Sequence, residues 1–288
     1  MIKIMKKMIK KIIGRHIISR IIFLLITISV VIDFPILSFS DEAGWNDKQL
    51  QKIDKTKNKF SFAVFGDTRD SGGRFEDLIK KLSRDDVVFA MDIGDLVTHG
   101  RKEEFIPLMR QIKELNKPFL AVAGNHDLIN NEPTNYCEFF GRRYYSFYIG
   151  NSYFIIVDNS KKTALDEKQM SWLEEELRNS QKYKFRFVFM HIPLYDSRES
   201  KYTKGHSLNS LSFAKVLNDL FDKNRVTMLF ASHIHGYFRG RWQKTPYIIT
   251  GGGGAGLHGN DPENYFFHYI KVDVLDSIVR YSVQRLKD

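Results

Sequence analysis

Short apolar segments alternate with helical patterns through most of the chain. Apolar runs bounded by polar loops are typical of buried strands, whereas apolar residues spaced three and four apart predict helices with one buried face. We predict strands at 60–65, 87–93, 118–123, 153–157, 185–190 and 226–231. Helices are predicted between them at 74–82, 102–115, 166–177 and 208–221, the third with Asp166 as its N-cap. The alternation predicts an α/β architecture.

The pattern changes after residue 236. Strand-like segments follow one another without helices at 237–242, 247–250, 265–274 and 277–285, which predicts a second, more antiparallel sheet. At the other end, the polar segment 41–58 is interpreted as a linker or a short leading helix. The folded domain is therefore expected at 59–288.

The first forty residues have a composition of their own. They contain seven Lys and Arg residues and one acid, so they hold +6 of the formal net charge of +10 and leave +4 for the rest. An apolar run at 21–32 follows, and then Ser38 and Ser40 supply small residues before a cleavage point. We expect 1–40 to be a signal peptide that directs export to the periplasm or the extracellular space. Adding the apolar residues of 12–18 lengthens the run, so an uncleaved N-terminal membrane anchor is the alternative.

Composition excludes several classes of protein. Cys137 is the only cysteine, so there is no intramolecular disulfide and no Cys-rich zinc framework. An apolar fraction of 43% suits one large domain and excludes a disordered chain. The segment 130–148 mixes aromatic residues with Arg142 and Arg143, but its alternation fits a strand on the core better than a nucleic-acid surface. No nucleic-acid partner is expected.

Polar residues capable of chemistry follow five of the predicted strands. Because ligands of open α/β sheets bind beyond the carboxyl ends of the strands, these residues are expected to meet at one place. They are Asp67, Asp95, the sequence Asn125-His126-Asp127, His191, and the pair His233 and His235.

Carboxylate, amide and imidazole groups without thiolate suit zinc, manganese, iron or similar divalent ions. An Asp shared between two such ions would hold them as a pair. Paired ions activate a water molecule and clamp the oxygens of an in-line displacement at phosphorus. Phosphoester hydrolysis is thus the reaction class that this set of residues favours.

The ordered motifs resemble those of the calcineurin-like metallophosphoesterases. The resemblance covers about 60–254 and includes a Gly-Asp, a Gly-Asn-His-Asp, a lone His after a strand and a His-x-His. It implies a four-layer sandwich of two mixed β-sheets flanked by helices. It also implies two divalent ions, manganese, iron or zinc, and a small phosphoester substrate.

The same resemblance implies individual roles. The metal ligands would be Asp67 and His235 for the first ion, Asn125, His191 and His233 for the second, and Asp95 as the bridge. Asn125 and His126 would also contact the substrate. In this scheme a metal-bound hydroxide attacks phosphorus, His126 protonates the leaving oxygen as a general acid, and Asp127 holds the other ring nitrogen of His126.

The chain departs from the family pattern at two positions. Arg69 stands where the first motif has a His, and a guanidinium cannot ligate a metal. We expect Arg69 to bind phosphate oxygens instead, as a catalytic and substrate-binding residue, and the first ion to be weakly held. Ser232 replaces a Gly before His233 and removes no ligand.

Other segments carry weaker signals. The glycines at 251–254 are interpreted as close backbone packing beside the site rather than as a nucleotide loop. The polar segment 194–207 is the candidate for a substrate-contacting rim. His99 and His258 are interpreted as surface histidines that could reach the site, and His206 and His268 carry no signal.

The sequence therefore predicts an exported metallophosphoesterase, either a phosphatase or a phosphodiesterase. Two alternatives stay open. The substitution at Arg69 allows a phosphate-binding protein with a weakened one-metal site and little turnover. An uncleaved leader would give a membrane-anchored hydrolase of lipid phosphates.

Overall fold

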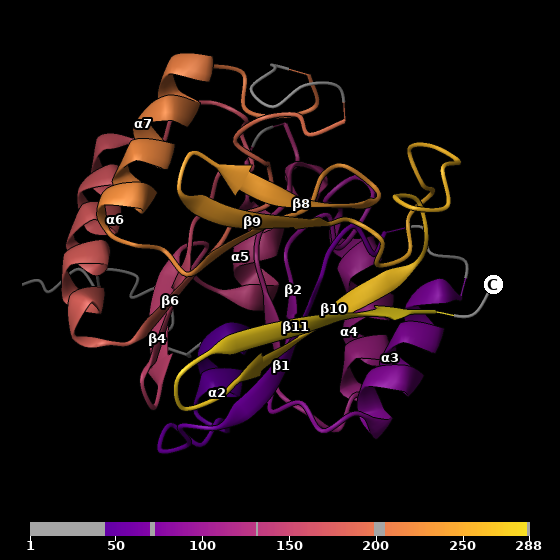
Figure 1. Ribbon diagram of the computed structural model, residues 1–288. Coiled ribbons are helices and arrows are strands. Elements are labelled where there is room, and N and C mark those ends of the chain that lie inside the picture. Colours follow the sequence, from indigo (N-terminus) through magenta and orange to yellow (C-terminus); the bar gives the residue numbers. More distant parts are fainter. Residues whose placement is uncertain (1–43, 70–72, 131, 199–204, 287–288) are drawn as a thin grey trace, which may run out of the picture. The chain divides into compact units, whose positions relative to one another are not determined.

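Two mixed β-sheets pack face to face in the computed structural model, which describes residues 44–69, 73–130, 132–198 and 205–286 (Figure 1). The predicted signal peptide or anchor at 1–40 lies outside the described residues. Among those described, no helix has both the length and the apolar character needed to cross a bilayer.

The first sheet has five strands in the order β11-β10-β1-β2-β3. They are β11 (Val279–Arg285), β10 (His268–Val274), β1 (Phe60–Phe65), β2 (Ala90–Asp92) and β3 (Phe119–Ala121). Strands β1, β2 and β3 are parallel, and β10 runs antiparallel to both β1 and β11.

The second sheet has six strands in the order β4-β5-β6-β7-β9-β8. They are β4 (Tyr145–Ile149), β5 (Ser152–Ile156), β6 (Phe185–Phe189), β7 (Met228–Ala231), β9 (Thr245–Thr250) and β8 (Tyr237–Trp242). The four central strands β5, β6, β7 and β9 are parallel, and the outer strands β4 and β8 are antiparallel to their neighbours.

Alternation along the central strands fills three apolar layers. In β1, Phe62 and Val64 belong to the core between the sheets, whereas Ala63 and Phe65 face the helices on the outer side. In β6, Phe187 and Phe189 face the first sheet, and Val188 faces the opposite helices. Strands buried on both faces read as continuous apolar runs, which is why the sequence pattern located them.

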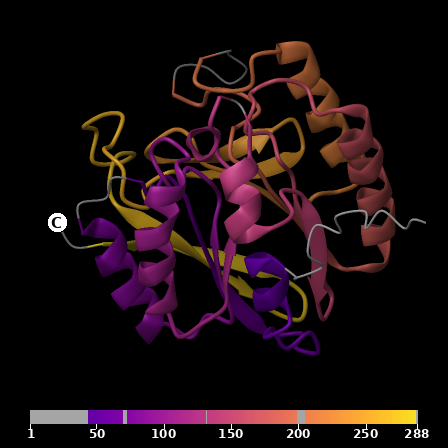
Figure 2. The ribbon, with the colours of Figure 1, turned by 180° about the vertical axis from the view of Figure 1, so that it is seen from behind.

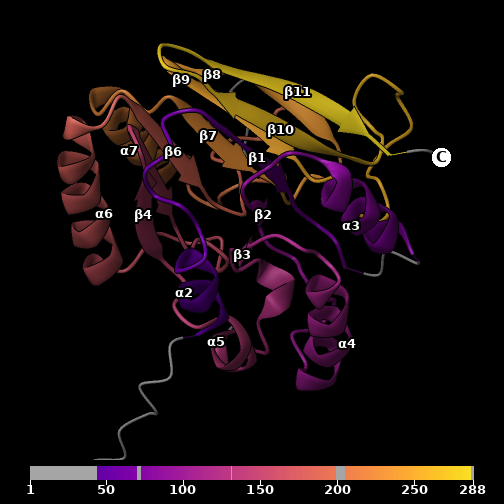
Figure 3. The ribbon, with the colours of Figure 1, turned by 90° about the horizontal axis from the view of Figure 1, so that it is seen from below.

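Helices cover the outer face of each sheet. The five-stranded sheet packs on α3 (Arg74–Arg84), α4 (Lys102–Lys113) and α5 (Thr134–Phe140), and the six-stranded sheet packs on α6 (Glu167–Asn179) and α7 (Leu211–Lys223). Figures 2 and 3 show α3 and α4 on the side opposite α6 and α7. The expected four-layer sandwich is confirmed, and Asp166 caps α6 by accepting a hydrogen bond from the Gln169 N–H (2.8 Å).

Two expectations about the elements were wrong. Residues 130–148 contain a helix, α5, before the strand β4, because Tyr136 and Phe140 are one helical turn apart and both are buried. The later strands do not form a sheet of their own. Strands β8 and β9 extend the six-stranded sheet, and β10 and β11 complete the five-stranded one.

The segment interpreted as a linker or a short leading helix contains α2 (Trp45–Leu50), and this helix packs on the domain. The Asn46 side chain donates to the Ala121 carbonyl (3.1 Å) and accepts from the Ala121 N–H (2.9 Å). The Trp45 indole donates to the Phe119 carbonyl (2.8 Å). These bonds are made to β3, which is an edge strand of the five-stranded sheet. The folded unit therefore starts before Lys59, the residue at which it was expected to start.

Candidate metal centre

The candidate residues of both sheets meet beyond the carboxyl ends of the parallel strands. His191, after β6, directs its Nδ1 to the Ile93 carbonyl after β2 (3.0 Å). The His233 N–H, after β7, donates to Asp67 Oδ2 after β1 (2.8 Å). Asn125 Oδ1, after β3, lies 3.2 Å from His191 Nε2. Each of these contacts joins one sheet to the other, so the sandwich itself assembles the centre.

Two groups of buried ligand-type side chains share Asp95. In the first group, made of Asp67, Asp95 and His235, and in the second, made of Asp95, His191 and His233, the ligand atoms lie within 4.8 Å of one another. His235 Nε2 is 3.3 Å from Asp67 Oδ1, and His191 Nε2 is 3.2 Å from Asp95 Oδ1. Asp95 thus belongs to both groups of side chains that could hold a metal ion.

The centre contains buried polar atoms that have no hydrogen-bond partner within the described part of the chain. They are Asp67 Oδ1, Asp95 Oδ2 and His233 Nε2. Leaving such atoms unpaired costs about 1–3 kcal/mol each. Divalent cations bound by the two groups would satisfy all three, since carboxylate oxygen and imidazole nitrogen are usual ligands of such ions. The residues therefore fit the metal ions that the sequence predicts.

Three of these residues have a left-handed backbone. The φ angles of Asp67, Asp95 and His233 are 59°, 59° and 65°. This conformation is uncommon for residues other than glycine and is found where a site constrains the chain. Gly124 makes room for one of them, because a Cβ atom there would lie 2.1 Å from the Asp95 nitrogen.

The carboxylates and imidazoles strongly affect each other's ionisation. Burial alone would raise the pKa of Asp95, but the imidazoles of His191 and His126 outweigh it and hold that pKa well below its usual range. Burial would lower the pKa of His191, yet the neighbouring Asp95 carboxylate raises it to about 9. The pKa of His233 is lowered by burial and by the other histidines, which leaves its Nε2 free to act as an electron-pair donor.

His126 and Asp127 lie next to each other but do not interact as the resemblance implied. His126 Nδ1 bonds the Thr98 carbonyl (2.7 Å), and its Nε2 is 4.0 Å from Asp95 Oδ2. The Asp127 carboxylate accepts instead from backbone N–H groups, at 2.8–3.1 Å. The donors belong to Gly124, Asp95, Leu96 and Val97. Asp127 thus fixes the loop that carries Asp95, and Thr98 takes the role expected of Asp127.

Arg69 lies against the first group of side chains. Its Nε is 3.7 Å from Asp95 Oδ2, and its Nη2 is 3.5 Å from His235 Nε2. The guanidinium therefore lies beside two side chains of the first group. Only 17% of the side chain is exposed, so this positive charge is held at the centre rather than in solvent.

Ser232, the second departure from the family pattern, lies behind the centre. Its hydroxyl donates to the Ile93 carbonyl (3.3 Å) and lies 3.1 Å from His191 Nδ1. It also fills the space next to Gly66, where a Cβ atom would be 2.5 Å from the Ser232 oxygen. The hydroxyl therefore contacts the ring nitrogen of His191 that faces Ile93, not the Nε2 that faces Asp95.

Two further histidines stack on the candidate ligands. The His206 ring lies flat on His233 (centroids 3.9 Å apart), and the His258 ring lies flat on His235 (3.8 Å). His258 was expected to be able to reach the site, whereas the sequence carries no signal of this kind for His206. The signal available for His206 was instead its place in the predicted rim, 194–207. Burial lowers the pKa of each ring to about 4, so both are neutral near pH 7.

The glycine run at 251–254 packs closely beside the centre, as predicted. A Cβ atom on Gly251 would lie 2.6 Å from Asp67 Oδ2, and one on Gly253 would lie 2.5 Å from the Gly66 carbonyl. The Gly253 N–H donates to that same carbonyl (2.9 Å). Only residues without side chains allow the chain to pass so near the first group.

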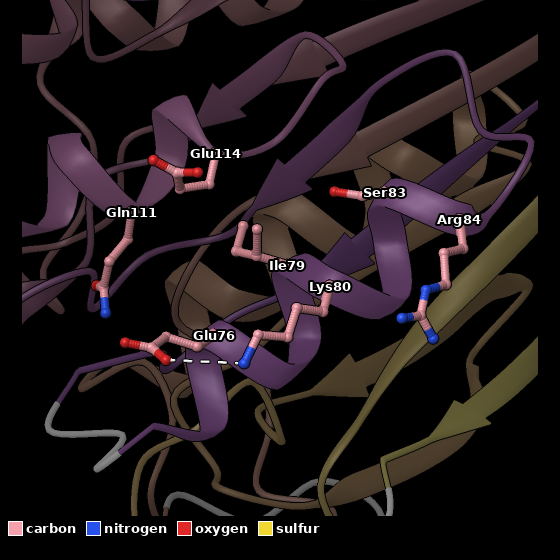
Figure 4. A pocket seen from close by; sticks show the side chains of 7 residues that line it. All are labelled: Glu76, Ile79, Lys80, Ser83, Arg84, Gln111 and Glu114. Atoms are coloured by element: carbon pink, nitrogen blue, oxygen red, sulfur yellow. Dashed lines mark ion pairs between the residues drawn. The ribbon is translucent and has the colours of Figure 1, made fainter.

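A shallow pocket of about 350 Å³ opens next to the centre. It is lined by Asn125 and His126 together with Thr98, His99 and Arg101 among others, so His99 lies beside the site as the sequence allowed. A separate pocket of about 500 Å³ lies between α3 and α4 (Figure 4). None of the candidate residues lines the second pocket.

Comparison with known proteins identifies the family of the chain. The profile of the family described as calcineurin-like phosphoesterase matches residues 60–237. The human serine/threonine-protein phosphatase CPPED1 is 29% identical over 207 residues, which are 65% of this chain and 64% of that protein. Purple acid phosphatase 21 of Arabidopsis thaliana is 25% identical over 244 residues, which are 75% of this chain and 54% of that protein. The chain thus spans between about half and two thirds of these relatives.

Solved structures share the fold. The purple acid phosphatase PPD1 of yellow lupin superposes on 82% of this chain with a TM-score of 0.64 and 19% identity, and 54% of that protein is covered. The matching family is a class of hydrolases of phosphoric esters, and the centre of this chain holds side chains that could bind metal. This chain belongs to the calcineurin-like phosphoesterase family within that class.

Proposed function

We propose that this protein hydrolyses small phosphoesters with two divalent metal ions, manganese, iron or zinc. A phosphomonoester is the favoured substrate class, with a phosphodiester next. The observation that carries the proposal is the pair of buried ligand groups joined by Asp95. When bound, the ions would polarise the phosphoryl oxygens and supply an activated water molecule.

The residues divide between the two ions. Asp67 and His235 would hold the first, and Asn125, His191 and His233 would hold the second, with Asp95 shared. The contact between His191 Nδ1 and the Ile93 carbonyl keeps Nε2 of that ring directed at the second group.

His126 is proposed as the general acid. Because Nδ1 is bound to the Thr98 carbonyl, the imidazolium form can release a proton only from Nε2, which lies on the Asp95 side. The side chain is 35% exposed, so a leaving alkoxide can approach it. Asp127 supports the reaction from a distance by fixing the loop of Asp95.

This assignment predicts the effect of two substitutions. Asp95→Asn should reduce hydrolysis of 4-nitrophenyl phosphate to the level of the buffer, because both ions lose a ligand. His126→Ala should lower kcat by about a hundredfold or more. Release of nitrophenol in the presence of Mn²⁺ is the measurement. Asp77→Asn, on the exposed part of α3, is the matched control and should retain full activity. Full activity in either site variant would refute the assignment.

We also propose that Arg69 contacts the phosphate and that the first ion is weakly held. The guanidinium occupies the side of His235 and Asp95 where a further ligand is lacking, and its planar group suits two phosphate oxygens.

The metal content of the protein tests this proposal. After gel filtration the protein should retain about one equivalent of metal, since three protein ligands and an adjacent cation hold the first ion poorly. Arg69→His should raise the content to about two equivalents, because it adds a ligand and removes the positive charge. Arg69→Gln separates the two effects by removing the charge alone. Two tightly held equivalents in the unaltered protein would contradict the weak first site.

The position of Arg69 also favours a second candidate function, a phosphate-binding protein with little turnover. In that case a single ion and Arg69 would hold phosphate without activating water. Calorimetric binding of inorganic phosphate to a protein that hydrolyses none of a panel of phosphoesters with manganese, zinc or iron would select this candidate.

We further propose export of the protein, from the cationic and apolar sequence of 1–40. Cleavage after Ser40 would leave Asp41 as the first residue, whereas an uncleaved anchor would keep Met1 and favour lipid phosphates as substrates. N-terminal sequencing of the mature protein distinguishes these two outcomes. Its recovery from the cytoplasm with an intact leader would reject export.

A further inference from the structure

The loop between β5 and α6 is fastened to the His191 loop of the candidate centre. Asn159 accepts from the N–H groups of His191 (3.1 Å) and Ile192 (3.0 Å), and its amide donates to the Ile192 carbonyl (2.7 Å). Asn159 is buried, so these bonds are shielded from water. The residues that follow Asn159 are therefore held beside the second group of ligands.

Lys162 is the residue that this loop brings to the centre. Its N–H closes a turn onto the Asn159 carbonyl (3.0 Å), and its own carbonyl accepts from the Asn209 N–H (3.0 Å). Lys162 has a left-handed backbone, with φ at 59°. Since Leu208 in turn bonds the Pro193 carbonyl (3.1 Å), the Lys162 turn is fixed between the His191 loop and the end of the predicted rim.

The charge of Lys162 acts on the centre. Burial lowers the pKa of Lys162, and the Asp95 carboxylate opposes this shift because it favours the ammonium form. The side chain is half-buried and has no ion-pair or hydrogen-bond partner among the residues that the structure describes. By contrast Arg198, another cation that acts on His206, is paired with the Asp196 carboxylate (2.7 Å).

The neighbouring lysine has different surroundings. Lys161 is exposed and forms an ion pair with Glu132 (3.7 Å). It also lines a pocket with Arg143 and Asp158 to which Lys162 does not contribute. Two consecutive lysines thus differ in whether their charge is neutralised by the protein.

We propose that Lys162 binds a second anionic group of the substrate, a carboxylate or a further phosphate on the alcohol that leaves. The inference rests on the proposed hydrolysis. The transferring phosphoryl group would lie over the side chains that share Asp95, with Arg69 on the side of His235. Lys162 belongs to the turn that Asn159 fastens to the His191 loop, and the remainder of a substrate would extend to that side. An unpaired, half-buried cation there favours phosphoesters that carry an additional negative charge.

Three aryl phosphates of similar shape test this inference. They are phenyl phosphate, 3-carboxyphenyl phosphate and its uncharged counterpart 3-carbamoylphenyl phosphate, and 1,3-phenylene bisphosphate adds a second phosphate. We expect kcat/KM for the carboxylate to exceed that for the carboxamide by about tenfold, the ratio expected of one partly buried ion pair. Comparing the carboxylate with the bisphosphate shows which of the two anionic groups is preferred.

Substituting each of the two lysines shows which of them causes the preference for the carboxylate over the carboxamide. Lys162→Gln should bring the kcat/KM values of the carboxylate and the carboxamide to within about twofold of each other, because the two esters differ only in the second charge. Lys161→Gln should keep the preference. The inference is overturned if the unaltered protein hydrolyses both esters equally well, or if the preference survives in Lys162→Gln.

Binding of non-hydrolysable phosphonates separates this inference from the proposed function. Calorimetry with Mn²⁺-loaded protein should give about tenfold tighter binding of 3-carboxyphenylphosphonate than of 3-carbamoylphenylphosphonate, and Lys162→Gln should abolish the difference. A protein without hydrolytic activity that still shows this difference would refute the proposed function and retain the anion site. Equal binding of the two phosphonates would reject the site whether or not the protein is active.

Discussion

The candidate ligands sit on residues whose backbone is under constraint. Asp67, Asp95 and His233 all adopt the left-handed conformation two or three residues after a strand ends. This backbone conformation is unfavourable for each of these residues, and favourable packing around it has to compensate. Glycines make this possible by allowing neighbouring loops to approach within contact distance, as Gly124 does beside Asp95. The precision of the centre therefore depends on residues that take no part in chemistry.

One substitution at this scale tests that dependence. Gly124→Ala would place its Cβ atom 2.1 Å from the Asp95 nitrogen, so backbone has to shift. We expect the free energy of unfolding to fall by about 2 kcal/mol or more, together with a loss of bound metal. Gly256→Ala is the control, because its Cβ atom would meet nothing within 4 Å. Urea denaturation measures the free energy of unfolding of each variant, and metal analysis measures its bound metal. Equal stability of the two variants would contradict the tight packing.

Most of the candidate residues could be located from sequence because they follow apolar strands at short spacing. The partners of their side chains could not. Asp127 was expected at His126 because the two are adjacent in sequence, yet a buried carboxylate surrounded by four backbone N–H groups has no need of an imidazole. The role of His206 could not be predicted, because nothing in its local sequence shows that its ring stacks on His233.

Among the elements, the short helix α2 has more influence than its length suggests. Asn46 bonds both backbone groups of Ala121 on the edge strand β3, where no further strand is available to pair with them. Polar composition made this segment resemble a linker. Its buried polar contacts are long-range, and a local pattern does not report them.

Truncating the Asn46 side chain should destabilise the folded protein. In Asn46→Ala the Ala121 N–H would be left buried without a partner, and we expect a loss of about 1–3 kcal/mol in the free energy of unfolding. Lys52→Ala, which removes a side chain from the adjacent exposed turn, should change it little. Thermal unfolding monitored by circular dichroism compares them, and an unchanged midpoint for Asn46→Ala would show that α2 is not part of the stable fold.

At the scale of the whole molecule, the class of fold was predictable and the assignment of strands to sheets was not. Continuous apolar runs identify strands buried on both faces, and their alternation with helices identifies the α/β class. The last four strands looked like one antiparallel group because they follow one another without helices. They divide between the sheets instead. Strands β9 and β8 extend one sheet beyond β7, and strands β10 and β11 extend the other beyond β1.

The pairing of β1 with β10 also sets the order in which the molecule can be completed. Phe60 lies opposite Val274 in this ladder, so one side of a central strand stays open until almost the whole domain has been synthesised. The ribosome delivers β10 last but for β11, and contacts so distant in sequence form slowly. The first sheet is therefore completed only after β10 has been synthesised. Under the proposed export, this delay favours passage of the still unfolded chain through a narrow channel.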